Sequence, residues 1–571
     1  MFKQAHLINN NTNPCNEVYL LQGFVGLREK KRLNLQRNFC PTHTRGMKKF
    51  IFTKSLICLL AFSWTCNAVR ATNTDALTGD GTLRCYRLAI PITKSAYAED
   101  LSGNYNNAIR FWHECEAFVN KMFIPLGFCF DVVEDSRLIN LADLPLNPYN
   151  GLPEIGNCTY NLNQTMGSEA YDVAMWVMHR DDFEENTGLS ALKGAYSSNT
   201  KGSGYAKTDK WVVAHELGHM FGAVHTLQGE GSLMDNTGEY FSYPSIKAIR
   251  NSAIGATSYN NIEVTNNAPV IDANEMQKTY RIPQGACLAI DVHATDVENH
   301  QLMYTAIGCT SANVDNVQEG SALTLPFASF APQESRVIRY APTYTADYFY
   351  EDYFYLKDGT GIHEMSPGTY PLSILVNDVP NAPWSYTDLT ENPFYSAYAI
   401  WETQIEIIAG TPFSATLNTE KRSFTAGEKV TLKWGVNSNY FTPESRLRIT
   451  LSADYGETFP HLLADNIPAL NGEHTFALPN IAIGQVEVDF TTAKRMMNGG
   501  IIKIEEIGGV AFTQTALNPM DNQSFTLAGN ADHISQPSSL PHNEACYDLL
   551  GRPVMKPTKG AYIVNGKKVI F

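Results

Sequence analysis

Residues 215–225 read HELGHMFGAVH, and this stretch constrains the chain more than any other. On an α-helix, His215 and His219 are about one turn apart, so both imidazoles leave the same face and can bind one metal ion. Glu216 lies beside them and is placed to act as a general base rather than as a ligand. The pattern therefore predicts a helix that carries a metal centre with water-activating chemistry.

A third ligand follows from the residues after the helix. Gly222 permits a sharp turn of the backbone, and this turn can return His225 to the same ion. Three imidazoles leave the fourth position of a tetrahedral zinc site open for water. The five fixed positions of this pattern should occur by chance in only about one chain in tens of thousands. We expect Zn²⁺ to be held by His215, His219 and His225.

A methionine completes the arrangement. Met234 lies in GSLMD, nine residues after His225, in a turn beside a glycine. The whole arrangement resembles the metzincin zinc metallopeptidases, and within them the reprolysin-like (adamalysin-like) group, in which a Met-turn supports the three-histidine site from below. The resemblance implies a twisted α/β domain with Glu216 as catalytic base, and Gly222 and Met234 as structural support.

One feature of related groups is missing. Astacin- and serralysin-like enzymes carry a tyrosine two residues after the methionine, where this chain has Asn236. Tyr240 is near in sequence, but we expect it to be packed rather than catalytic. His179 lies outside the motif and is expected to be structural.

The resemblance extends over residues 82–258, and we assign the catalytic domain to residues 83–258. The apolar run at 85–92 predicts a buried strand, and apolar residues at three- and four-residue spacing from Ile109 to Met122 predict a helix. Further expected elements are strands at 128–133 and 171–179 and a closing helix at 243–254. Residues 188–198 resemble the edge strand that lines the cleft in metzincins, to which an extended substrate could pair.

The start of the chain carries an export signal. Residues 47–71 combine three lysines, a short apolar run and small residues suited to cleavage, as in a signal peptide. We therefore expect translation to begin at Met47 and residues 1–46 to be a mis-annotated extension. The apolar run is shorter than the about 20 residues that span a bilayer, so no stable membrane span is expected. In the short segment before the catalytic domain, 72–82, Asp75 or Asp80 is a candidate latch for the open zinc position.

The charge and the length of the chain limit its possible partners and its number of domains. The net charge of −15 and the pI near 5.4 argue against nucleic acid as a partner, because a nucleic-acid site needs a basic face. The 571 residues are enough for several domains.

Seven of the eleven cysteines follow the signal peptide. Cys85, Cys115, Cys129 and Cys158 allow two disulfides in three connectivities, and Cys287 is a possible partner of Cys309. Cys546 is left over. The alternative is that these residues are buried free thiols.

The sequence changes character near residue 265. Short runs rich in Thr, Tyr, Val and Ile, broken by Gly, Pro and Asn, predict two all-β Ig-like sandwiches at 265–408 and 409–517. In the second, Trp434 is expected on a core strand, and residues 451–460 and 499–509 on a hairpin and a closing strand. In the first, Asp296, Glu298 and Asn299 are candidate Ca²⁺ ligands, although solvated turn residues are the plainer interpretation.

The last segments resemble an export tag. Residues 518–544 are polar and predict a linker. Residues 545–571 contain YDLLGR and GAYIVNGKKV, which resemble the C-terminal sorting signal of the bacterial type IX secretion system; otherwise they form a terminal β-hairpin. The resemblance implies contact with outer-membrane secretion machinery and a location outside a bacterium that has an outer membrane.

The sequence thus predicts a secreted zinc endopeptidase that hydrolyses peptide bonds of extracellular proteins. Two alternatives remain open. One is an adhesin whose β-modules bind a ligand and whose peptidase domain is vestigial. The other is a zinc amidase that acts on a cell-wall substrate.

Overall fold

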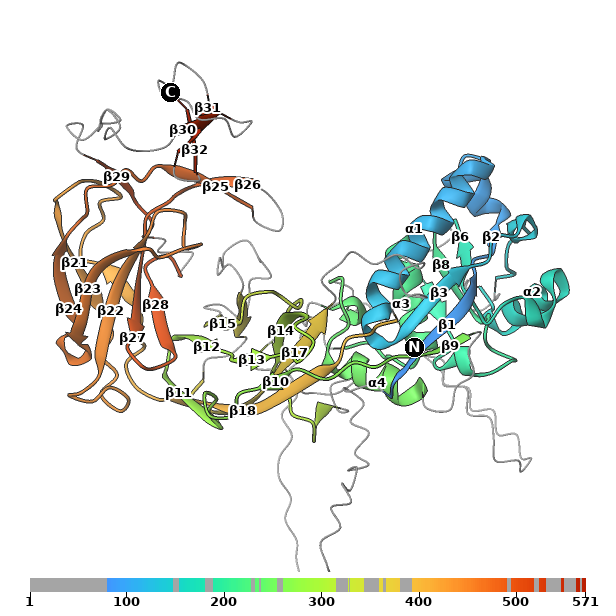
Figure 1. Ribbon diagram of the computed structural model, residues 1–571, viewed down its shortest axis with the longest axis horizontal. Coiled ribbons are helices and arrows are strands. Elements are labelled where there is room, and N and C mark those ends of the chain that lie inside the picture. Colours follow the sequence, from blue (N-terminus) through green and yellow to red (C-terminus); the bar gives the residue numbers. More distant parts are fainter. Residues whose placement is uncertain are drawn as a thin grey trace, which may run out of the picture. The chain divides into compact units, whose positions relative to one another are not determined.

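The chain forms two compact units in the computed structural model (Figure 1). Unit 1 comprises Met1–Met276, Val292–Arg336 and Leu372–Glu402, and unit 2 comprises Gln277–Asp291, Val337–Pro371 and Thr403–Phe571. The structure describes residues 80–146, 153–179, 188–226, 232–235, 238–253, 260–314, 327, 329–342, 359–362, 366–379, 393–489, 494–517, 523–529, 546–548, 561–564 and 567–570. The predicted signal peptide, 47–71, and the linker, 518–544, lie mostly or wholly outside these ranges.

A twisted, mainly parallel sheet forms the centre of unit 1. Its strands are β1 (Thr82–Ala89), β2 (Ile92–Thr93), β3 (Phe128–Val132), β4 (Ile139–Leu141), β5 (Val173–Ala174), β6 (Trp176–Met178), β7 (Gly188–Ser190), β8 (Gly204–Lys207) and β9 (Asn260–Glu263). The strands β3, β1 and β5 are adjacent, and the second half has the order β4-β2-β6-β8-β7. The two halves are continuous because the amides of Met175 and Val177 donate to Ala89 and Pro91.

Two strands of this sheet are antiparallel. β9 pairs with the first half of β1, and β7 pairs with β8 at the end of the strand order. β1 is buried on both faces, as expected for a strand inside a parallel sheet. The predicted strands at 85–92, 128–133 and 171–179 are therefore present.

Helices cover the sheet (Figure 1). The long α1 (Tyr105–Phe123) contacts β3 and α3, and its buried residues include Phe111, Trp112, Cys115 and Val119. These apolar side chains recur at helical spacing, which is why the sequence predicts this helix. The remaining α-helices are α2 (Cys158–Met166), α3 (Lys210–Met220) and α4 (Tyr243–Ala253).

Single turns of other helix types connect these elements. The 3₁₀ segments are Ile124–Leu126, Ser136–Leu138, Ile155–Asn157, Ser168–Ala170, Gly194–Tyr196, Leu233–Asp235 and Ala469–Asn471, and Ala96–Asp100 is a π-turn. The segment at Gly194 shortens the predicted edge strand, because the chain leaves extended geometry after Ser190. The edge strand is thus Gly188–Ser190 rather than most of 188–198.

Unit 1 also contains strands from the predicted first sandwich. β10 (Val270–Ile271) pairs with β13 (Ala294–Thr295), and β14 (Gln301–Ile307) pairs with the long β17 (Gly368–Val379). Residues Ile307, Cys309, Val314, Leu375 and Tyr398 are buried in the same hydrophobic core as the catalytic sheet and helices. The core around the sheet therefore includes residues far downstream of 258.

Unit 2 is built from strands. One sheet has the order β16 (Gly359–Ile362), β15 (Val337–Pro342), β12 (Cys287–Asp291), β28 (Ala511–Gln514), β27 (Ile501–Glu506), β22 (Arg446–Ser452) and β23 (His461–Pro468). A second has the order β19 (Ala415–Leu417), β21 (Lys429–Trp434) and β24 (Glu473–Ala477). The remaining pairs are β20 (Ser423–Thr425) with β29 (Thr526–Ala528) and β25 (Gln485–Asp489) with β26 (Lys494–Asn498). In addition, β11 (Thr279–Pro283) pairs with residues 404–408, the last part of β18 (Tyr398–Ile408).

The predicted core strand and hairpin of unit 2 are present. Trp434 is buried on β21, and its indole N–H donates to the carbonyl of Ala469 at 2.8 Å. β22 and β23 form the predicted hairpin. The last strands, β30 (Cys546–Asp548), β31 (Ala561–Val564) and β32 (Lys567–Ile570), form a small antiparallel sheet, which fits a short β tail.

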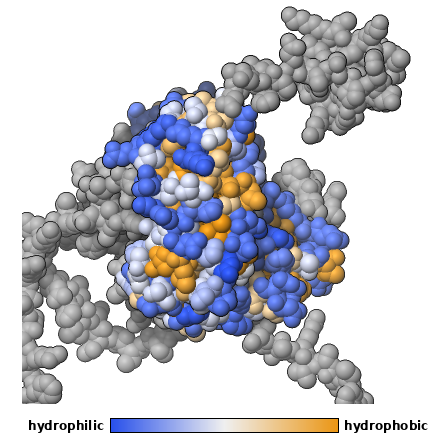
Figure 2. Space-filling model, turned by 90° about the vertical axis from the view of Figure 1, so that its left-hand side faces the viewer, coloured by the Kyte–Doolittle hydropathy of each residue, from blue (hydrophilic) through white to orange (hydrophobic). Residues whose placement is uncertain are grey.

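Hydrophobic residues on the face drawn in Figure 2 form separate patches among hydrophilic ones. Among the described residues, no helix combines the length and the apolar character that a bilayer span requires.

The predicted disulfides are wrong for the six described cysteines. Cys85, Cys115, Cys129, Cys158, Cys287 and Cys309 are all buried free thiols. Cys85 and Cys129 face each other as register partners on β1 and β3, but no bond joins them. The alternative from the sequence analysis therefore holds, since these thiols pack as small apolar side chains.

Candidate metal centre

The helix α3 presents the first two histidines. Its N-cap is Asp209, whose carboxylate accepts from the amide of Trp211 at 2.8 Å. His215 and His219 follow one turn apart, and both are buried. The ring of Trp211 stacks on that of His215, with centroids 5.6 Å apart, which restricts how the imidazole can rotate.

Gly222 turns the chain back toward the site. Its φ is 109°, in the left-handed region that favours glycine. A Cβ at this position would lie 2.4 Å from the hydroxyl oxygen of Ser252, so α4 also excludes a side chain here. Both features fit the sharp turn that the sequence predicts at Gly222, and the turn leads directly to His225.

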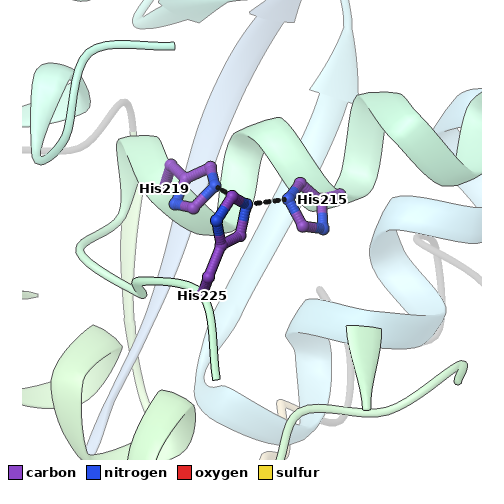
Figure 3. Close-up of side chains that lie close together, drawn as sticks. All are labelled: His215, His219 and His225. Carbon is purple, nitrogen blue, oxygen red and sulfur yellow. Dashed lines mark hydrogen bonds between the residues drawn. The ribbon is translucent and has the colours of Figure 1, made fainter. Parts of the chain in front are cut away.

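The three imidazoles converge on one point (Figure 3). The Nε2 atom of His225 lies 3.1 Å from Nε2 of His215 and 3.1 Å from Nε2 of His219. Tetrahedral zinc with bonds of 2.0–2.1 Å would separate neighbouring ligand nitrogens by about 3.3 Å. The spacing of the three nitrogens therefore suits a shared zinc ion.

Hydrogen bonds fix the tautomers of two of these rings. Nδ1 of His215 donates to the carbonyl of Leu233 at 2.8 Å, and Nδ1 of His219 donates to the carbonyl of Ala223 at 2.9 Å. A carbonyl can only accept, so each Nδ1 carries the proton and each Nε2 keeps a free lone pair. Both Nε2 atoms are thus ready to bind a cation.

Burial keeps these rings neutral. It lowers the pKa of His215 to about 4 and that of His219 well below its usual value, and the neighbouring imidazoles lower both further. A metal ligand must be an unprotonated imidazole. The donor set of three nitrogens, two of them on buried rings, therefore fits Zn²⁺, which favours imidazole and four ligands.

The methionine turn lies directly behind the helix. Met234 is fully buried, and a Cβ on Gly218 would lie 2.7 Å from its sulfur, so the glycine within HELGH makes room for this side chain. The carbonyl of Met234 accepts from the amide of Thr226 at 3.2 Å. Leu233, beside it, supplies the carbonyl that orients His215. Met234 therefore packs against the helix of the first two histidines, in a turn whose Leu233 carbonyl orients His215.

Glu216 points toward the edge strand β7. It is buried, and its carboxylate accepts from the hydroxyl of Ser190 at 2.9 Å. The same hydroxyl lies 2.9 Å from the backbone carbonyl of Glu216. A Cβ on Gly188 would lie 2.6 Å from Oε1 of Glu216, so this glycine leaves space for the carboxylate. Burial raises the pKa of Glu216 to about 8, and the bond from Ser190 opposes this shift.

Sequence reasoning missed Ser190 and Gly188. Both belong to the segment predicted as the edge strand, but no spacing rule connects them with Glu216. The connection arises from the pairing of β7 with β8, which places Ser190 opposite Gly204, and from the packing of α3 on these strands.

Other predicted residues lie away from the centre. The hydroxyl of Tyr240 is 2.7 Å from that of Ser329, so this tyrosine is packed, as expected. His179 bonds Asp100 at 2.9 Å, which fits a structural role. Asp80 forms a two-point ion pair with Arg84, so the structure does not show it as a latch. Asn236 and Asp75 lie outside the described residues.

The predicted Ca²⁺ ligands take part in different contacts. A carboxylate oxygen of Glu298 bonds the side-chain amide of Asn267 at 2.5 Å, whereas the carboxylate of Asp296 lies beside His300 and Asp378. Asn299 has a φ of 60° and belongs to the turn between Asp296 and His300. Of the three predicted ligands, only Asp296 is in a cluster of possible metal ligands among the described residues.

The chain was compared with solved structures, with curated proteins and with models of protein families. Among solved structures, the chain is similar to Sidekick-1 immunoglobulin domains 1–5, with 12% identity, a TM-score of 0.12, and coverage of 48% of this chain and 43% of that one. It is also similar to Drosophila N-cadherin EC1-4, with 12% identity, a TM-score of 0.15, and coverage of 44% and 50%. The chain thus spans half or less of either structure, and TM-scores this low establish no shared fold.

No curated protein matches the chain. Residues 154–276, the stretch that carries the three histidines, match the family model described as Metallo-peptidase family M12B Reprolysin-like, which supports a metallopeptidase domain here.

Proposed function

We propose that this protein is a zinc-dependent endopeptidase that cleaves extracellular proteins, with Glu216 as the general base. The observation that carries the proposal is the convergence of three Nε2 atoms, two of them on the helix that also carries the buried carboxylate of Glu216. Bound zinc supplies a Lewis acid that acidifies water and polarises a peptide carbonyl. The family match supports a metallopeptidase in general, and the base and the substrate are parts of the proposal.

The chain's own residues provide the base and a place for the substrate. Glu216 accepts the proton of the attacking water and can return it to the leaving amine. Ser190 holds the carboxylate in position. β7 is the last strand in its sheet order, so an extended peptide can add to it by backbone hydrogen bonds. Because Glu216 contacts this strand, a peptide bound there lies close to the base.

Three observations speak against the vestigial-domain alternative. The three histidine nitrogens converge, Ser190 holds the carboxylate of Glu216, and Met234 packs against the helix. The observations favour neither a cell-wall amide nor an adhesive ligand of the β-strands over peptide bonds.

Two substitutions separate the base from the ligands. Glu216→Ala should lower cleavage of casein or a peptide library by at least about 10²-fold and keep the zinc, because a base contributes to the rate and not to metal binding. His219→Ala should lose both cleavage and zinc. Glu114→Ala, at an exposed position on α1, is the control. Unchanged cleavage by Glu216→Ala would overturn the assignment.

We also propose that the protein is exported and that residues 545–571 direct passage across an outer membrane. The support is the resemblance of both ends of the chain to export signals. A host that makes a form ending at residue 544 should retain it in the periplasm, while the full chain appears outside the cell. Equal amounts outside the cell would show that the three terminal strands have no part in export.

A further inference from the structure

A second cluster of ligand-type side chains lies in unit 1, outside the histidine site. Asp296 follows β13, His300 precedes β14, and Asp378 lies on β17. The antiparallel pairing of β14 with β17 places Asp378 opposite Leu302, two residues from His300. Strand pairing therefore brings together three residues that are up to 82 positions apart in the sequence.

The distances within this cluster suit metal ligands better than hydrogen bonds. Nδ1 of His300 lies 3.6 Å from Oδ1 of Asp296 and 3.5 Å from Oδ2 of Asp378. Hydrogen bonds between such groups measure about 2.7–3.0 Å. Ligand atoms that share a tetrahedral ion with bonds of about 2.0–2.1 Å lie about 3.4 Å apart.

Two buried polar atoms in the cluster have no hydrogen-bond partner. Among the described residues, Nδ1 of His300 and Oδ2 of Asp296 are buried without a hydrogen-bond partner. The side chain of Asp296 is 1% exposed and that of Asp378 is 0% exposed. Burying a carboxylate oxygen without a partner lowers the stability of the fold by on the order of several kcal/mol, unless a cation compensates its charge. Two polar atoms of the cluster thus lack a hydrogen-bond partner, and a bound cation would compensate for this loss.

The two carboxylates also disfavour each other. Burial raises the pKa of Asp378, and Asp296 raises it further, while donors from Ala397 and Asn266 act in the opposite direction. These donors occupy defined oxygens, since Ala397 N–H bonds Oδ1 at 2.7 Å and the Asn266 amide bonds Oδ2 at 2.7 Å. Both carboxylate oxygens of Asp378 are therefore oriented before any ion binds.

We propose that Asp296, His300 and Asp378 form a second metal site that binds a first-row divalent cation of the Zn²⁺ class. The imidazole decides the class, because Ca²⁺ and Mg²⁺ take oxygen ligands whereas zinc and its neighbours accept imidazole with carboxylates. The ring of His300 packs edge-on against Phe394, with centroids 5.1 Å apart, which holds the imidazole in place.

The role of this ion is structural. Asp378 bonds the backbone of Ala397, and the adjacent carbonyl of Ser396 accepts from the buried guanidinium of Arg250 on α4 at 2.6 Å. The ion therefore stabilises a segment that also anchors a helix of the metallopeptidase domain. Its loss should lower thermal stability without removing the zinc held by the three histidines.

Metal analysis of the full chain tests the proposal. Wild type should contain two equivalents of zinc, His219→Ala one, His300→Ala one, and the double variant none. His113→Ala, at an exposed position on α1, should keep two. The zinc content of His219→Ala tests the histidine site, and the zinc content of His300→Ala tests the second site. The two assignments are therefore tested separately.

A Co²⁺ titration decides the matter even if His300→Ala does not fold. His219→Ala with Co²⁺ should show the visible absorption of a nitrogen- and oxygen-bound ion, and Asp296→Asn in that background should abolish it. Chelation should lower the melting temperature of His219→Ala. A His219→Ala protein that gives no Co²⁺ band, or that binds Ca²⁺ but neither Co²⁺ nor Zn²⁺, overturns the proposal.

Discussion

Among single residues, Ser190 connects the sheet with Glu216, the proposed base. Its hydroxyl bonds the carboxylate of Glu216 and approaches the backbone carbonyl of the same residue. A carboxylate held at one oxygen presents the other oxygen in a fixed direction. Ser190 is thus a positioning residue, because it acts through Glu216 and not on the substrate.

Removing this hydroxyl should slow the reaction without emptying the metal site. We expect Ser190→Ala to lower kcat by about 10-fold or more, since a hydrogen bond to a charged group is worth about 1.5–3 kcal/mol. KM and zinc content should change little, and Ser190→Thr should restore part of the rate. A fall in zinc content that matches the fall in rate would show that Ser190 only supports the fold. Steady-state kinetics and metal analysis on the same preparations make this comparison.

The buried histidines make the metal-free protein sensitive to acid. The pKa of His215 is about 4 in the folded protein, against about 6.5 for an unperturbed histidine. Between these values the unfolded chain binds more protons, so the stability contributed by the neutral ring is complete above pH 6.5 and is lost as the pH falls toward 4. The pKa of His219 is shifted in the same direction.

Thermal unfolding in the presence of a chelator measures this effect. The free energy of unfolding should fall by on the order of 1 kcal/mol for each pH unit between about 6 and 4 for one such histidine. His219→Gln should show a shallower dependence than wild type, because one of the two rings is gone. A melting temperature that is the same at pH 7 and pH 4.5 would contradict the prediction.

Among the helices and strands, the sequence predicted those whose own residues show a clear hydrophobic periodicity. The helix expected from Ile109 to Met122 is α1, Tyr105–Phe123, because its apolar residues alone define the buried face. By contrast, α2 spans nine residues with few apolar ones and was not predicted. The edge strand was predicted too long, since Lys193 adopts a φ of 58° and the chain turns into a 3₁₀ segment.

The residues of the two candidate metal sites also divide into those that local sequence predicts and those that it does not. The three histidines, Glu216, Gly222 and Met234 were predictable, because helix geometry and one turn determine their relation. Ser190, Gly188 and the cluster at His300 were not, because they depend on which strands pair and in which register. Non-local pairing also explains why β12, from the predicted first sandwich, lies in a sheet with β28, more than 200 residues later.

For the whole molecule, the extent of the core decides where the peptidase domain can end. Ile307, Cys309, Val314, Leu375 and Tyr398 belong to the core that contains the catalytic sheet. Arg250 donates to the carbonyls of Pro125, Leu126 and Ser396, and the last of these lies beyond residue 390. Residues 393–398 therefore complete a buried site of the unit that carries the three histidines.

A fragment that ends at Met276 contains the whole family match but lacks these residues. We expect it to be much less stable than the full chain, because it exposes the core surface that Leu375 and Tyr398 cover and leaves Arg250 without one of its acceptors. Circular dichroism during thermal unfolding, and cleavage by the fragment, measure the difference.

Point variants of the full chain separate packing from chain length. Leu375→Ala should destabilise the protein by about 2–4 kcal/mol, as for other buried leucines, and should lower the melting temperature at which peptidase activity is lost. Leu470→Ala, at an exposed position in unit 2, should leave that temperature unchanged. If the fragment ending at Met276 unfolds at the temperature of the full chain, or if both leucine variants behave alike, then the catalytic domain ends near residue 258, as its sequence alone suggested, and the downstream strands of unit 1 contribute nothing to its stability.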